Sequence, residues 1–129
     1  MKTLEELDAV QQDGHAIKYI KKPSPEIQLA AVQQYGYAIQ HIEDPPLEVQ
    51  LAAVRQNGFA IQFIENPTPE VQLAAVCQNG WAIKFIKNPS AEVQLAAVQK
   101  SEDGQAIRCI KKPAQEVLNY ILTLEVMSA

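Results

Sequence analysis

A unit of 22 residues recurs along the chain without gaps, and this periodicity constrains the fold more than any other feature. Residues 23–44 read PSPEIQLAAVQQYGYAIQHIED, and residues 45–66 and 67–88 repeat the pattern. A fourth copy, residues 89–112, carries two additional residues near Ser101. A repeat of this length is typical of a solenoid, in which each unit buries its apolar face against its neighbours. All five glycines occupy one slot of the unit: Gly14, Gly36, Gly58, Gly80 and Gly104.

The two ends of the chain are partial copies of the unit. Residues 1–22 contain its second half, with Asp8 where other units have alanine, and residues 113–129 begin like a unit but continue without a glycine. Terminal repeats of solenoids depart from the pattern because one of their faces meets water. We therefore expect one helical-repeat domain, residues 1–129, with a polar N-terminal cap and a longer C-terminal capping helix.

The sequence of each unit predicts a longer helix followed by a short one. Ser24, Thr68 and Ser90 stand where an N-cap is needed, and a glutamate follows in the first turn, where it meets the positive end of the helix dipole. The Leu-Ala-Ala-Val run favours helix. We expect Asn57-Gly58 to form a left-handed C-cap, so that the glycines close helices and do not open them.

The second helix is expected to be barely two turns long and partly 3₁₀ in character. Ala60, Ile61 and Ile64 have helical spacing, and burial of the isoleucines against neighbouring units would hold the segment in place. The fold class is thus an all-α solenoid of two-helix repeats. A leucine-rich β-strand horseshoe has repeats of similar length, but its L-x-x-L-x-L strand is missing here.

The alanine pair within each unit would let adjacent first helices approach closely. Two columns of glutamine also recur with the unit. We expect the glutamines to bond between layers or to neighbouring backbone, although a ladder of ligand contacts is an alternative. The columns are Gln28, Gln50, Gln72 and Gln94, and Gln34, Gln56 and Gln78.

Composition excludes several classes of protein. Hydrophobic residues make up 47% of the chain, enough for a core, and the net charge of -4 differs from the basic balance typical of nucleic-acid binders. No apolar run reaches the ~20 residues needed to span a bilayer, and the N-terminus is too polar for a signal peptide. Cys77 and Cys109 fall in different slots without a C-x-x-C motif, which favours a reducing cytoplasm.

No set of residues predicts catalysis, a cofactor or a metal. His15 and His41 occupy different slots, each replacing an aromatic residue of sister units, and neither has a nearby carboxylate or cysteine partner in sequence. The glutamates of the first turns are explained by the helix dipole. We therefore expect the protein not to be an enzyme.

Slots that vary between copies are the candidates for recognition. The residue after the glycine is His15, Tyr37, Phe59, Trp81 or Gln105, and aromatic residues are good interface anchors, although they could instead fill gaps between layers. A charged stripe follows them, basic at both ends of the chain and acidic in the middle, which suits electrostatic matching with a protein more than an extended polyanion. The predicted partner-binding residues are Tyr37, Phe59, Trp81, Lys84, Lys87, Arg108 and Lys111.

The motif P-S-P-E-x-x-L-A-A-V resembles the leucine-rich repeat variant and short HEAT-like units, which are helical solenoids. The motif Q-N-G-x-A-I is similar to a repeat of unknown function found in bacterial, phage and effector proteins. This resemblance implies a helical repeat without catalytic residues. It suggests a cytoplasmic protein-binding module, such as a phage- or mobile-element-encoded inhibitor of a host defence protein. A self-assembling structural repeat, and hence a homo-oligomer, a designed consensus repeat and a nucleic-acid binder are the alternatives.

Overall fold

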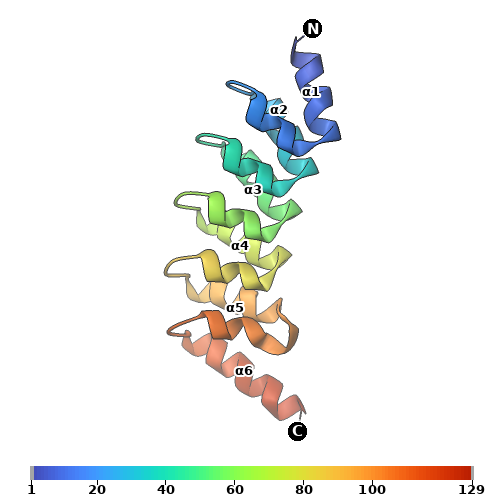
Figure 1. Cartoon of the computed structure of the whole chain (residues 1–129). Coiled ribbons are helices and arrows are strands. Elements are labelled where there is room, and N and C mark those ends of the chain that lie inside the picture. Colours follow the sequence, from blue (N-terminus) through green and yellow to red (C-terminus); the bar gives the residue numbers. More distant parts are fainter. Residues whose placement is uncertain (1, 129) are drawn as a thin grey trace.

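The computed structural model describes residues 2–128 as an elongated stack of helices, with the two ends of the chain at opposite ends of the stack (Figure 1). Longer α-helices alternate with short 3₁₀ helices, and residues 2–128 contain no strand. Each element packs against its partner in the same unit and against the adjacent units. The predicted all-α solenoid of two-helix repeats is therefore confirmed.

The first helix of each unit is an α-helix of similar length, and the last one is longer. The α-helices are α1 (Lys2–Gln12), α2 (Pro25–Gln34), α3 (Leu47–Gln56), α4 (Pro69–Gln78), α5 (Ala91–Gln99) and α6 (Gln115–Ser128). The second helices are short 3₁₀ helices, and the last one is kinked at Asp103 and Gly104, whose backbone angles are not helical. They are η1 (Gly14–Tyr19), η2 (Gly36–His41), η3 (Gly58–Phe63), η4 (Gly80–Phe85) and η5 (Glu102–Cys109).

The first helices begin where the sequence predicted. The hydroxyls of Ser24, Thr68 and Ser90 accept hydrogen bonds from backbone amides three residues later, at 3.2–3.3 Å. These bonds satisfy amides that have no partner within the helix. Helix α3 differs, because Pro46 stands at its N-cap and has no side chain that can accept such a bond.

The prediction of a left-handed cap at Asn57-Gly58 is wrong. Asn57 is extended, with φ of −153°, and its side chain accepts a hydrogen bond from the Phe59 amide at 3.0 Å, so Asn57 and Gly58 open the second helix. In the fourth copy the left-handed residues are Asp103 and Gly104, whereas in residues 1–22 and in the first three copies one such residue stands at the end, before a proline. The residues before a proline are Lys22, Asp44, Asn66 and Asn88, with φ of 48–52°.

Steric contact with the next unit explains why Gly58 and its equivalents are glycine. A Cβ atom added to Gly58 would lie 2.5 Å from the carbonyl oxygen of Ala75 in the next unit, and one added to Gly36 would lie 2.6 Å from that of Ala53. Adjacent layers therefore approach so closely at this slot that any side chain would separate them. The exception is Gly104, which has φ of 70° because the two additional residues change the turn.

One apolar core runs along the whole stack. Within the second complete unit, residues 45–66, Val49, Ala53 and Val54 of α3 and Ala60 and Ile61 of η3 are fully buried. Their counterparts in the other complete units are also buried, apart from Ile107 in the unit with the insertion. A buried isoleucine or valine side chain contributes about 1.5–3 kcal/mol relative to an exposed one. Repetition of this small set of side chains stabilises each short helix through its neighbours.

Both glutamine columns bond to backbone, as the structural interpretation predicted. Gln56 Oε1 accepts a hydrogen bond from the amide of Gly36 at 2.6 Å, and Gln78 does the same for Gly58, so this column links adjacent layers. Gln50 and Gln72 donate to the carbonyls of Pro45 and Pro67, five residues earlier, at 2.9 and 3.0 Å. The column that contains Gln50 and Gln72 thus closes the turn that leads into each first helix.

The C-terminal helix is longer than the others, as expected, and its exposed side chains include four large apolar ones beside polar ones. Leu118, Leu122, Val126 and Met127 of α6 are exposed, whereas a solenoid cap normally presents polar side chains to water. In the described part of the chain, no helix is both long and apolar enough to cross a membrane.

Candidate functional site

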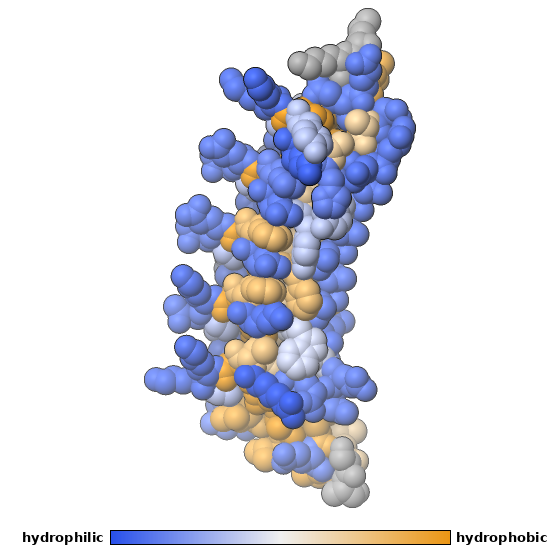
Figure 2. All heavy atoms as spheres, viewed as in Figure 1, coloured by the Kyte–Doolittle hydropathy of each residue, from blue (hydrophilic) through white to orange (hydrophobic). Residues whose placement is uncertain are grey.

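The second helices and the loops that follow them form one continuous surface, which we call the second-helix edge (residues 14–23, 36–45, 58–67, 80–89 and 102–113). Consecutive second helices contact one another along the stack, from η1 to η5. Figure 2 shows polar loops projecting along one side, beside a column of apolar and weakly polar side chains that runs down the molecule. The varying slots therefore lie together, although they are 22 residues apart in sequence.

Aromatic side chains pair between adjacent units on this edge. The ring centroids of Tyr37 and Phe63 are 5.4 Å apart, and those of Phe59 and Phe85 are 5.8 Å apart, both in edge-to-face arrangements. Tyr37 and Phe59 are half-buried against the core. These two residues thus fill space between layers, which was the alternative to a role as interface anchors.

Trp81 differs from Tyr37 and Phe59 because the next unit has Cys109 where the others have phenylalanine. The indole is 37% exposed. Among the predicted anchors, Trp81 therefore has the most surface available for a partner.

A row of exposed aromatic residues was missed in the predicted site. Tyr19, Phe63 and Phe85 end their second helices and are all exposed, Tyr19 to 80%. Phe63 and Phe85 contact the half-buried Tyr37 and Phe59 from outside, and all three offer larger free faces than these two. The signal in the sequence was an aromatic that recurs at one slot between two varying charged slots, for example Tyr19 between Lys18 and Lys21.

The predicted basic residues are partly brought together. Lys84, Lys87 and Lys111 line a groove between the loop after η4 and the loop after η5, where Lys112 joins them. Arg108 is exposed on η5 but does not line this groove. The Lys84 ammonium lies 5.1 Å from the Phe59 ring centroid and 5.2 Å from that of Phe85, so a cation–π interaction holds it on the aromatic pair.

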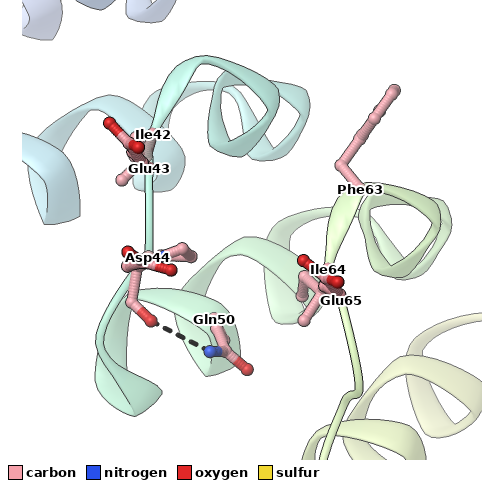
Figure 3. A pocket seen from close by; sticks show the side chains of 8 residues that line it. Ile42, Glu43, Asp44, Gln50, Phe63, Ile64 and Glu65 are labelled. Carbon is pink, nitrogen blue, oxygen red and sulfur yellow. Dashed lines mark hydrogen bonds between the residues drawn. The ribbon is translucent and has the colours of Figure 1, made fainter.

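An acidic groove occupies the equivalent place nearer the N-terminus. Ile42 and Glu43 lie on one side of it and Ile64 and Glu65 on the other, with Gln50 between them, its amide bonded to the carbonyl of Pro45 (Figure 3). A third groove between the two has both Glu65 and Lys87 in its lining. Charge along the edge therefore changes from acidic to basic within three neighbouring grooves.

The two histidines lie at the N-terminal part of this edge. The His15 ring packs against Tyr35 in a tilted arrangement, with centroids 4.1 Å apart and an interplanar angle of 37°. Burial lowers the pKa of His41 below its ordinary value of 6.5, and the nearby charges of Lys18 and His15 lower it further. Within the described residues, no three histidine, cysteine or acidic side chains are grouped as a metal site requires.

Comparison with known proteins returned no match: no family model, no curated protein and no solved structure is similar to this chain.

Proposed function

We propose that this protein is a non-catalytic protein-binding module, and that its partner docks on the C-terminal half of the second-helix edge. The observation that carries this proposal is the exposure of Trp81 and Phe85 beside the basic groove. Exposed aromatics next to charged side chains are the composition of energetic hot spots in protein interfaces. A helical solenoid supports such a surface on rigid, repeated elements.

The charges favour a protein partner over nucleic acid. A phosphate backbone lying along the edge would meet the basic groove and then the acidic groove formed by Glu43, Asp44 and Glu65. A protein surface can instead present the complementary sequence of charges, acidic opposite Lys87 and Lys111 and basic opposite Glu43 and Glu65. The partner we expect therefore has an apolar contact patch flanked by an acidic cluster.

A role as an inhibitor of a host protein, encoded by a phage or mobile element and acting in the cytoplasm, is the more specific form of this proposal. Its support is the similarity of the Q-N-G-x-A-I motif to repeats of bacterial, phage and effector proteins.

Affinity capture with matched variants tests the proposal. The wild-type protein, the double variant Trp81→Ala/Phe85→Ala and the control Arg55→Ala/Gln99→Ala, whose changed side chains are exposed on first helices, are used as baits in extracts of the source cell. We expect the wild type and the control to retain one protein that the Trp81→Ala/Phe85→Ala variant loses. Circular dichroism must show all three baits folded. Equal capture by all three would remove Trp81 and Phe85 from the binding surface.

Charge reversal in the basic groove tests whether its lysines contribute to binding. Lys87→Glu/Lys111→Glu is expected to weaken binding of the captured partner at least tenfold, and more strongly at low salt than at high salt. Binding of DNA or RNA with a steep salt dependence, abolished by the same variant, would support the nucleic-acid alternative instead.

A further inference from the structure

The three grooves of the second-helix edge are lined by equivalent residues of successive units. Each groove has two isoleucines, a proline and a glutamine at the same slots, which in the acidic groove are Ile42, Ile64, Pro45 and Gln50. The groove between the acidic and the basic one, which we call the middle groove, and the basic groove repeat these residue types further along the stack. The edge therefore offers a row of equivalent grooves that repeats with the layers.

An exposed phenylalanine borders two of these grooves. Phe63 lines the acidic groove and Phe85 lines the middle groove, and both side chains are more than a third exposed. Cys109 takes the same slot in the basic groove. Aromatic-lined grooves are surfaces on which proline-rich segments dock, because such segments are already extended and lose little conformational entropy on binding.

The spacing of the layers selects the conformation of a segment that lies along the edge. Packed helices are about 8–10 Å apart, and consecutive second helices have Cα atoms within 8 Å of each other. A polyproline II helix returns to the same face every three residues, or about 9.3 Å. An α-helix does so about every 5.4 Å and a β-strand about every 6.6 Å, out of register with the layers. A polyproline II segment therefore presents one side chain to each groove.

The charges of the grooves determine which side chains such a segment needs. Glu43, Asp44 and Glu65 line the acidic groove, so a basic side chain suits it. The basic groove lies two layers further on, a distance that six residues of polyproline II span at about 19 Å. An acidic side chain suits this groove, which is lined by Lys84, Lys87, Lys111 and Lys112. The middle groove has both Glu65 and Lys87 in its lining beside Phe85, which suits an apolar side chain.

We propose that the second-helix edge binds an extended, proline-rich segment in the polyproline II conformation. A basic side chain of this segment lies at the acidic groove, and an acidic side chain six residues away lies at the basic groove. The inference rests on the proposed function, because it names the part of the protein partner that occupies the edge.

Synthetic peptides test this register. The in-register probe is a fluorescein-labelled, proline-rich peptide with lysine and glutamate six residues apart and a leucine midway, made in both chain directions. The out-of-register probe has the same composition with the two charges five residues apart, so that they lie on different faces. In fluorescence anisotropy at low ionic strength, the in-register probe is expected to bind about three- to fivefold more tightly, the effect of one exposed ion pair.

Charge reversal locates the bound peptide. Lys87→Glu/Lys111→Glu is expected to bind the in-register probe about tenfold or more weakly, and to bind a probe with lysine in place of the glutamate more tightly than the wild type does. The matched control is Arg55→Glu/Lys100→Glu, which changes the net charge equally at exposed residues outside the edge. This control is expected to bind the in-register probe like the wild type, and circular dichroism must show both variants folded.

Two results with these peptides would overturn the proposal. The first is equal affinity of the in-register and out-of-register probes, and the second is no saturable binding of either one up to about 1 mM. If a partner is nevertheless captured through Trp81 and Phe85, the protein-binding function stands and the partner docks through a folded surface. Tighter binding of an alanine-rich helical peptide, with its charges about 21 Å apart on one face, would instead indicate a helical occupant.

Discussion

Glycine and asparagine stand next to each other in Asn57-Gly58, and at the residue scale each has a separate task. Asn57 is extended, and its side chain caps the second helix by accepting from the Phe59 amide. Gly58 has no left-handed conformation to explain it, and its role is to let the Ala75 carbonyl of the next layer approach. The left-handed position is Asn66, eight residues further on.

Replacing Gly58 with alanine is expected to destabilise the protein by about 1–3 kcal/mol, because the added Cβ atom forces the layers apart. Separation of the layers would also weaken the 2.6 Å bond between the Gly58 amide and Gln78. Urea unfolding monitored by circular dichroism measures the effect.

Asn66→Gly is the matched control, since a left-handed φ of 52° suits glycine, and we expect a change below about 1 kcal/mol. Equal stability of Gly58→Ala and the wild type would refute the steric explanation of this slot.

His41 should lose its proton at a lower pH than an ordinary histidine, since burial and the charges of Lys18 and His15 disfavour the protonated form. In the unfolded chain its pKa returns to about 6.5. The unfolded state then binds more protons as pH falls below about 6.5, so this group makes the folded state less stable at acidic pH.

Titration of the His41 ring followed by NMR is expected to show a pKa below 6.5 that rises in Lys18→Gln. A His41 pKa at or above 6.5 in the wild type would contradict this prediction.

At the scale of the element, the N-terminus of α3 lacks the side-chain hydrogen bond that caps α2, α4 and α5. Pro46 provides no side-chain cap, and it has no backbone N–H. The buried Oε1 of Gln28 has no hydrogen-bond partner. In the last pair of units the equivalent atom, Gln94 Oε1, accepts from the amide of Ala114, which occupies the slot of Pro46. The proline therefore accounts for both deficits.

Pro46→Ser is expected to stabilise the protein by about 1 kcal/mol, because it restores a cap and supplies an amide to Gln28, against a smaller loss of proline rigidity. The melting temperature should rise by about 4 °C.

The double variant Pro46→Ser/Gln28→Ala, compared with Gln28→Ala alone, measures the gain from the cap by itself, since both proteins lack the glutamine and its bond to the Pro23 carbonyl. A Pro46→Ser protein that melts below the wild type would show that proline rigidity outweighs both hydrogen bonds.

For the whole molecule, stability is expected to be highest in the middle of the stack. Each unit is held by its neighbours, and α1 and α6 each have a neighbour on one side only within residues 2–128. Opening from an end therefore breaks one interface, whereas opening in the middle breaks two.

Hydrogen exchange is expected to be slowest in α3 and α4 and fastest in α1 and α6. Uniform protection along the chain would indicate that the stack unfolds as one cooperative block.

Short-range spacing and local hydrogen-bonding chemistry were enough to predict the repeat, its two-helix content, the helix starts and the buried isoleucines. The sequence also indicated the basic and acidic parts of the edge. It misassigned Gly58, because the atom that forbids a side chain there, the Ala75 carbonyl oxygen, belongs to the next unit.

The exposure of the varying side chains, in contrast, could be read only from how the layers stack. Tyr37 and Phe59 follow their glycines as Trp81 does, yet they are half-buried because phenylalanines of the next unit pack on them, while Trp81 faces Cys109 in that slot. The same comparison between layers identified Phe63 and Phe85 as the outer aromatics. Exposure depends on contacts between residues more than 20 positions apart, so local pattern determined the scaffold and stacking determined the surface.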